Sequence, residues 1–246
     1  MSRLRSALGL GRSLAIYYGR PLRQRRLAGF YRGLLPHGAL AFDIGAHVGN
    51  RARALRASGA RVVALEPQAT FAAFLRLTLP GDVTLIEAAA GARTGTATLA
   101  VSRLHPTVSS LAGLPGVAGT AAGFEHVRWD ARQQVAVITL DALIAAHGRP
   151  DFVKIDVEGH EAEVLAGLSE PLPLVAVEYL PPLPGPARAA VRRLDALGPC
   201  RFNHVPGEAS AFAWPEWRDA EATLAWLDAL DPAAGSGDLY ARAAPA

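Results

Sequence analysis

One stretch constrains the fold of this chain more than any other: Ala-Phe-Asp-Ile-Gly-Ala-His-Val-Gly-Asn, residues 41–50. It reads as a short apolar strand over 39–44 that runs through a glycine-punctuated turn into a helix from about Val48. Gly45 suits this turn because glycine adopts positive φ readily and lets a ligand approach the backbone closely. The strand, turn and helix together predict the first unit of a nucleoside-binding α/β fold.

An acid closes the next strand as well. Glu66 follows the apolar run 61–65 and lies twenty-three residues after Asp43. An acid there hydrogen-bonds ribose hydroxyls in α/β folds of this kind. The glycines follow D-x-G-x-x-x-G, and the bulk of His47 obstructs a diphosphate while Asp43 repels one. The pattern favours a cationic nucleoside such as S-adenosylmethionine; a tight turn without a ligand is the alternative for the glycines alone.

Charge is distributed unevenly along the chain. The net charge is +3 over 246 residues, but residues 1–36 contain eight arginines and no acid, so the remainder is negative by five. We expect a basic helical arm over 1–36 that packs its apolar side chains on one domain, 37–246, with an insertion at about 96–138. The body lacks the interleaved aromatic and basic residues of nucleic-acid-binding proteins, so we expect no nucleic-acid partner.

Cysteine content and hydropathy restrict the cellular setting. The single Cys200 excludes an internal disulfide and fits a reducing compartment. No apolar run is long enough to span a membrane, and the N-terminal stretch lacks the apolar segment of a signal peptide. We expect a cytoplasmic protein without a transmembrane segment, and the sequence leaves its oligomeric state open.

Apolar strands alternate with helices along the chain, which indicates a doubly wound α/β sheet. We expect the main strands at 39–44, 61–65, 82–87, 151–155, 174–177, 200–204 and 238–242. The last two form an antiparallel pair. If the strand at 151–155 neighbours the first one, then the residues that follow it stand beside Gly45 at the topological switch point, where open α/β sheets bind ligands.

Polar residues surround the end of the strand at 151–155. The candidates for a catalytic role are Lys154, Asp156, Glu158 and His160, because a carboxylate or imidazole can take a proton from a reacting hydroxyl. Two simpler interpretations are that Asp156 caps the following helix and that Glu158 is a first-turn charge. We assign no metal ligand, although Asp156, Glu158 and Glu178 can form an oxygen-rich divalent-metal site if they converge.

Four motifs in this order resemble the FkbM-type S-adenosylmethionine-dependent methyltransferases: residues 42–50, 65–67, 139–141 and the Lys-Ile-Asp-Val-Glu-Gly-His-Glu run at 154–161. The resemblance covers roughly residues 35–180. It implies a doubly wound, Rossmann-like seven-stranded sheet that is mostly parallel with its last strand antiparallel, and helices on both faces. It also implies methylation, often on a hydroxyl of a sugar or natural product.

The same resemblance implies roles for individual residues. Asp43 and Gly45 line the methionine moiety, Glu66 holds the ribose, and Asp156 and Glu158 face the methyl-transfer site. The full set expected to bind the cofactor is Asp43, Gly45, His47, Gly49, Asn50, Glu66, Pro67, Glu87, Ala88 and Asp156.

We therefore expect a methyltransferase that uses S-adenosylmethionine to methylate a hydroxyl on a sugar or another small metabolite. The alternatives are a nucleotide-dependent oxidoreductase, which the missing G-x-G-x-x-G disfavours, and a non-catalytic nucleic-acid-binding module built on the basic arm.

Overall fold

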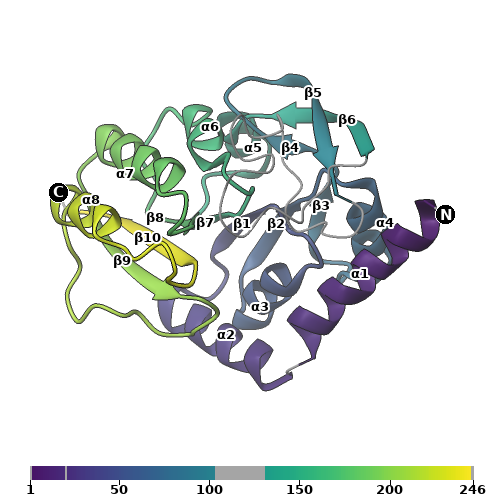
Figure 1. Cartoon of the computed structure of the whole chain (residues 1–246), viewed down its shortest axis with the longest axis horizontal. Helices are drawn as coiled ribbons and strands as arrows, with labels where there is room; N and C mark the ends of the chain where they lie inside the picture. The colour runs from purple at the N-terminus through teal and green to yellow at the C-terminus, as the bar shows by residue number, and fades with distance from the viewer. Residues whose placement is uncertain (1, 20, 103–130, 245–246) are drawn as a thin grey trace.

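The structure is a computed structural model that describes residues 2–19, 21–102 and 131–244 (Figure 1). The helices are α1 (Ser2–Tyr18), α2 (Pro21–Leu34), α3 (Asn50–Ser58), α4 (Ala69–Thr78), α5 (Leu140–His147), α6 (Glu161–Ala166), α7 (Gly185–Leu197) and α8 (Ala220–Asp228). The strands are β1 (Leu40–Ile44), β2 (Arg61–Leu65), β3 (Thr84–Ile86), β4 (Ala89–Ala90), β5 (Gly95–Val101), β6 (Ala131–Ile138), β7 (Phe152–Ile155), β8 (Leu174–Tyr179), β9 (Cys200–Pro206) and β10 (Gly237–Ala243).

Seven strands form the central sheet in the order β3-β2-β1-β7-β8-β10-β9. The neighbouring pairs from β3 to β8 are parallel, and β10 runs antiparallel to both β8 and β9. In this register Ile44 pairs with Leu65 on one side and with Ile155 on the other. The three strands therefore end at the same edge, and the residues that follow them are brought together at the switch point between β1 and β7. The mostly parallel sheet with an antiparallel last strand confirms the expected fold.

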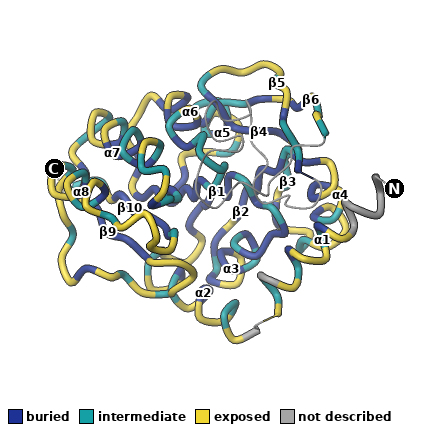
Figure 2. The backbone as a smooth tube through the Cα atoms, viewed as in Figure 1, coloured by how far each residue is buried: buried dark blue, intermediate teal, exposed yellow. Residues whose placement is uncertain are grey.

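Helices cover both faces of this sheet, so its central strands are apolar on both sides. Phe42 and Ile44 of β1 pack in one cluster with α5, α6, α7 and α8. Ala41, whose side chain points to the opposite face of the pleat, packs in a second cluster with α2 and α3. Figure 2 shows the central strands as buried, beneath helices with exposed outer faces. This arrangement holds the carboxyl edge of the sheet rigid.

A second, smaller sheet in the order β4-β6-β5 lies beside the main one at the top of Figure 1. β5 and β6 pair antiparallel, and β4 pairs parallel with the end of β6. This sheet occupies the two ends of the insertion expected at about 96–138, while its middle, 103–130, lies outside the described residues.

The N-terminal helices pack along the body. α2 begins at Pro21, which suits a first helical turn because its missing N–H has no partner there in any case. Tyr31 of α2 is fully buried, and Arg32 Nη2 donates to the carbonyl oxygen of Ala57 in α3 at 2.9 Å. Over the residues described here, no helix combines the length and the apolar composition needed to cross a membrane.

Candidate active site

A pocket opens at the carboxyl edge of β1, β2 and β7. Of the residues singled out from the sequence, those that line it are Asp43, Gly45, His47, Asn50, Glu66, Pro67, Ala88, Asp156, Glu158 and His160. Gly49, Glu87 and Lys154 do not line it. The structure therefore brings together the acids that end three neighbouring strands, as their positions in the sequence predicted.

The loop after β1 is folded tightly against the body. Gly45 has φ of 86°, and its N–H and that of Ala46 donate to the carbonyl oxygen of Leu65 at 3.0 and 2.8 Å. A Cβ on Gly45 would lie 1.9 Å from the carbonyl oxygen of Asp156. The close approach that requires glycine here is thus to the chain's own backbone, which ties the loop after β1 to the loop after β7.

Gly49 has a packing role. It is the N-cap of α3 at φ of 77°, and a Cβ on it would meet the Leu75 side chain at 2.7 Å. The helix accordingly begins at Asn50, two residues later than the sequence suggested.

Glu66 holds the first loop in place from β2. Its Oε2 accepts from the His47 N–H at 2.7 Å, and its Oε1 accepts from the Gln68 N–H at 2.8 Å. The residue is buried, and burial raises the pKa of its carboxyl to about 8 despite these two donors. Each oxygen keeps a lone pair for a further donor, so Glu66 can shape the loop and also bind a hydroxyl in the pocket.

Asp43 is the most deeply placed acid of the pocket, with 2% of its surface exposed. Its Oδ2 is sealed from solvent and has no hydrogen-bond partner among the described residues. Burial raises the pKa of Asp43 to about 6, although the cations of Arg51 and Lys154 act against this shift. A buried carboxylate oxygen without a donor is unfavourable unless a ligand supplies one.

His47 is the aromatic member of the first loop. Its ring lies edge-on to Phe71 with 4.2 Å between centroids, and edge-on to Tyr17 at 5.3 Å. Burial lowers the pKa of His47 to about 4, so the imidazole is neutral at neutral pH. Its left-handed φ of 51° is unusual for a residue other than glycine and gives the turn its shape.

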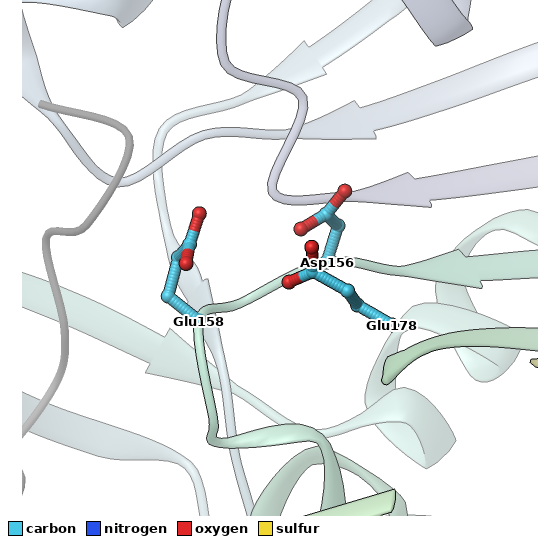
Figure 3. Close-up of side chains that lie close together, drawn as sticks. All are labelled: Asp156, Glu158 and Glu178. Atoms are coloured by element: carbon cyan, nitrogen blue, oxygen red, sulfur yellow. The ribbon is translucent and has the colours of Figure 1, made fainter. Parts of the chain in front are cut away.

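The loop after β7 brings three carboxylates together (Figure 3). Asp156 and Glu158 come from this loop and Glu178 from the end of β8, and one oxygen of each lies within 4.8 Å of the others. The convergence that the sequence left open is therefore present. Three acids so close cannot all be ionised without a compensating cation, because like charges disfavour each other's ionised form.

The pKa values of the three acids shift in different directions because their electrostatic surroundings differ. Burial acts to raise the pKa of Asp156, but the Lys154 and Arg51 cations outweigh it and the pKa is lowered. Burial and the charge of Asp156 raise the pKa of both Glu158 and Glu178 well above its ordinary value. Asp156 is thus the ionised member, and its two neighbours hold protons more strongly.

Lys154 lies behind this cluster, with none of its surface exposed. Its Nζ is 3.3 Å from Asp156 Oδ2 and 3.1 Å from Asp238 Oδ1, and Asp238 Oδ2 is 2.8 Å from Arg51 Nη2. Two cations and two anions alternate along this buried chain. Lys154 was expected among the catalytic residues, but its position behind the cluster makes its role toward Asp156 electrostatic support from beneath the pocket.

The two simpler interpretations of these acids are wrong. α6 begins at Glu161 with His160 as its N-cap, so Asp156 does not cap it and Glu158 is not in its first turn. Glu161 Oε1 instead accepts from the N–H groups of Val157 and Gly159 at 3.3 and 3.1 Å. Glu158, between them, has φ of 55°. The loop is built to present Glu158 rather than to start a helix.

Sequence reasoning placed three residues at the pocket that do not line it, Gly49, Glu87 and Lys154, and it missed others. Glu87 is exposed and paired with Arg76, whereas Ala88 lines the pocket. Tyr17 also lines the pocket and Asp238 anchors Lys154. Neither carried a local signal, because both come from segments far from the motifs.

Comparison with known proteins identifies the family of this chain. The family model described as the methyltransferase FkbM domain matches residues 43–234. No curated protein sequence matches the chain. Among solved structures, the chain is similar to an O-methyltransferase from Bacillus cereus in complex with SAH, at 13% identity, covering 96% of this chain and 90% of that one, with a TM-score of 0.46.

A second similar structure is precorrin-6y C5,15-methyltransferase from Geobacter metallireducens GS-15, at 13% identity, covering 91% of this chain and 88% of that one, with a TM-score of 0.45. The family match spans well over half of the chain, from the first acid of the pocket to beyond α8. The chain therefore belongs to the FkbM methyltransferase family, and it is an S-adenosylmethionine-dependent methyltransferase.

Proposed function

We propose that this enzyme methylates a hydroxyl group on a small molecule in the pocket at the ends of β1, β2 and β7. The observation that carries the proposal is the convergence of Asp156, Glu158 and Glu178 beside the loop after β1. Carboxylates at such a position suit an acceptor that must be oriented and must lose a proton. A sugar or another polyhydroxylated metabolite fits this chemistry.

The residues of the pocket fit S-adenosylmethionine. Asp43 offers a buried oxygen that lacks a donor, which suits the ammonium of the methionine moiety. Glu66, at the end of β2, keeps acceptor capacity for the ribose hydroxyls. Ala88 and its neighbours at the end of β3 provide an apolar wall for the adenine. When bound, the cofactor supplies an electrophilic methyl group on a sulfonium.

The second loop supplies the proton chemistry. Lys154 keeps Asp156 ionised, and this charge with burial gives Glu158 a raised pKa. The ionised Glu158 is consequently a stronger base than an exposed glutamate, and a neighbouring cationic ligand favours that ionised form. Glu158 orients the acceptor hydroxyl and takes its proton at a carboxylate oxygen, while Asp156 stays charged.

The test is a transfer assay with tritiated S-adenosylmethionine and a panel of sugars, phenols and aliphatic alcohols. We expect Glu158→Gln to bind S-adenosylhomocysteine with wild-type affinity and to lower turnover by roughly 10²–10⁴, the range for loss of a general base. Glu163→Gln, an exposed acid of α6, is the matched control and should keep full turnover.

Two further measurements sharpen the proposal. A thermal-shift comparison of S-adenosylhomocysteine with NAD should show stabilisation by the first alone. Repeating the assay with a chelator examines the divalent-metal alternative, which predicts that turnover falls and that Mg²⁺ restores it. Full turnover by Glu158→Gln on an authentic acceptor would remove the base from the mechanism and leave positioning as the main effect.

A further inference from the structure

The N-terminal arm contributes a side chain to the pocket. Within the described part of residues 1–36, Tyr17 of α1 is the residue that lines it, where it packs on the loop that follows β1. Its ring lies edge-on to His47 at 5.3 Å between centroids and an angle of 75°. His47 in turn packs on Phe71 at 4.2 Å, so the Tyr17 ring is the outer member of an aromatic row rooted in α4.

Tyr17 shares the pocket with Asp156 and Glu158 of the carboxylate cluster. Burial raises its pKa, and the charges of Asp156, Glu158 and Glu178 raise it further, which places the phenol within the field of all three acids. Arg51 is the cation that acts against this shift. The phenol therefore remains a neutral group with one O–H to donate, in a region otherwise rich in acceptors.

Contacts made by residues that follow Tyr17 in the chain hold the arm in this position. The neighbouring Tyr18 donates its O–H to the carbonyl oxygen of Val48 at 2.9 Å and accepts from Arg53 Nε at 2.8 Å. Further along, Arg23 Nη2 of α2 lies 3.0 Å from Glu208 Oε2, and Glu208 itself lines the pocket. The arm is thus attached at the first loop and again at Glu208, another residue of the pocket lining.

From these contacts we propose that Tyr17 is an acceptor-positioning residue: its ring closes the acceptor side of the pocket and its hydroxyl donates a hydrogen bond to an acceptor oxygen. This inference rests on the proposed function of the same site. The acceptor it selects carries an oxygen next to the hydroxyl that is methylated, so that Tyr17 binds one oxygen while Glu158 binds the other. Vicinal diols, as in sugars, have this arrangement.

The experiment compares Tyr17→Phe, Tyr17→Ala and the control Leu8→Ala, at an exposed position of the same helix, in the full-length protein. Calorimetry with S-adenosylhomocysteine should give all three wild-type affinity within about twofold. With the diol that the wild type methylates fastest, Tyr17→Phe should lower kcat/KM roughly tenfold, the value of one hydrogen bond. The matching mono-alcohol should show no such loss, and Leu8→Ala should behave as wild type with both compounds.

The outcomes separate this inference from the function on which it rests. Wild-type kcat/KM for Tyr17→Phe on the diol, or an equal loss on the diol and the mono-alcohol, would overturn the role of the hydroxyl. A tenfold loss of S-adenosylhomocysteine affinity in Tyr17→Phe would assign the residue to the cofactor instead. If the wild type binds S-adenosylhomocysteine but methylates no hydroxylated compound, the proposed function fails, and this inference fails with it.

Discussion

The loops after β1 and β7 are similar in their backbone construction, but they differ in the electrostatic state of their polar groups. Each loop follows a buried parallel strand, and each contains one residue other than glycine with positive φ: His47 in the first and Glu158 in the second. The two loops touch where Gly45 meets Asp156. In the first loop the backbone N–H groups are satisfied by the body. In the second, Glu161 satisfies the backbone while two of the carboxylates at its edge, Glu158 and Glu178, repel Asp156.

This difference indicates a division of labour. Hydrogen bonds from the N–H groups of the first loop to Leu65 and Glu66 make this loop a rigid frame against which a ligand can bind without reordering the chain. The second loop keeps charged groups in an electrostatically strained cluster, and perturbed pKa values of this kind are typical of reacting groups. Substitutions in and behind each loop measure how far the stability of the protein and its ligand binding depend on the residues that hold the loop in place.

Lys154 is the support of the second loop, and its loss should have the largest effect on stability. Lys154→Met leaves Asp156 and the buried Asp238 without their shared cation, so we expect unfolding free energy to fall by about 3–5 kcal/mol. Urea unfolding measures it. The control is Arg56→Met, which breaks the exposed pair with Asp82 and should leave the unfolding free energy nearly unchanged. Similar losses for both variants would mean that Lys154 is not a buried electrostatic anchor.

Gly45 joins the two loops, and its replacement comes next in size. In Gly45→Ala the new Cβ would meet the Asp156 carbonyl oxygen at a left-handed φ, so we expect a loss of about 2–4 kcal/mol in unfolding free energy. Gly148→Ala is the matched control, because Gly148 also has positive φ but its Cβ would find only Leu40 at 3.8 Å. Equal losses at both glycines would show that strain, and not the contact between loops, determines the effect.

Glu66 tests the first loop as a ligand frame. Glu66→Ala removes an acceptor from the pocket, so S-adenosylhomocysteine binding should weaken by about 1–3 kcal/mol in calorimetry. Because Glu66 also accepts from the His47 and Gln68 N–H groups, the variant should unfold at lower urea as well. Glu87→Ala should change neither quantity, since that side chain lies outside the pocket. Unchanged affinity in Glu66→Ala would contradict the ribose assignment.

The sequence predicted the sheet and the acids at its edge because both depend on local patterns. Apolar runs alternate with helices, and each strand that reaches the switch point ends in an acid. Glu87 shows the limit of that reasoning. Adjacent residues of an extended chain point to opposite sides, so only one of Glu87 and Ala88 can face the pocket, and the pattern alone did not say which.

Contacts between distant segments could not be predicted in the same way. Asp238 reaches Lys154 because β10 inserts between β8 and β9, a placement that depends on the packing of the whole sheet. Tyr17 reaches the pocket because Tyr18 and Arg23 attach the arm to the body, and neither contact has a sequence motif. A basic stretch rich in leucine and arginine predicts a helix, but it does not predict what that helix covers.

The smallest expected effect concerns the protonation of His47, and it distinguishes a buried frame from a solvated loop. Burial lowers the pKa of His47 to about 4 in the folded protein, while an exposed histidine titrates near 6.5, so the unfolded chain binds the proton first as pH falls. The contribution of the neutral imidazole to the free energy of unfolding is fully present above pH 6.5, the pKa in the unfolded chain, and it is lost as the pH falls toward 4. Between pH 7 and 5.5 the loss should be about 1 kcal/mol.

His47→Asn removes the titration and tolerates the left-handed backbone. Over that interval the free energy of unfolding of this variant, measured in urea, should therefore fall by about 1 kcal/mol less than that of the wild type. His204, whose pKa burial also lowers to about 4, stays in both proteins and cancels in the comparison. If the two proteins lose stability equally, the imidazole of His47 is solvated, and the first loop is not the dry, rigid frame that its contacts with Tyr17 and Phe71 indicate.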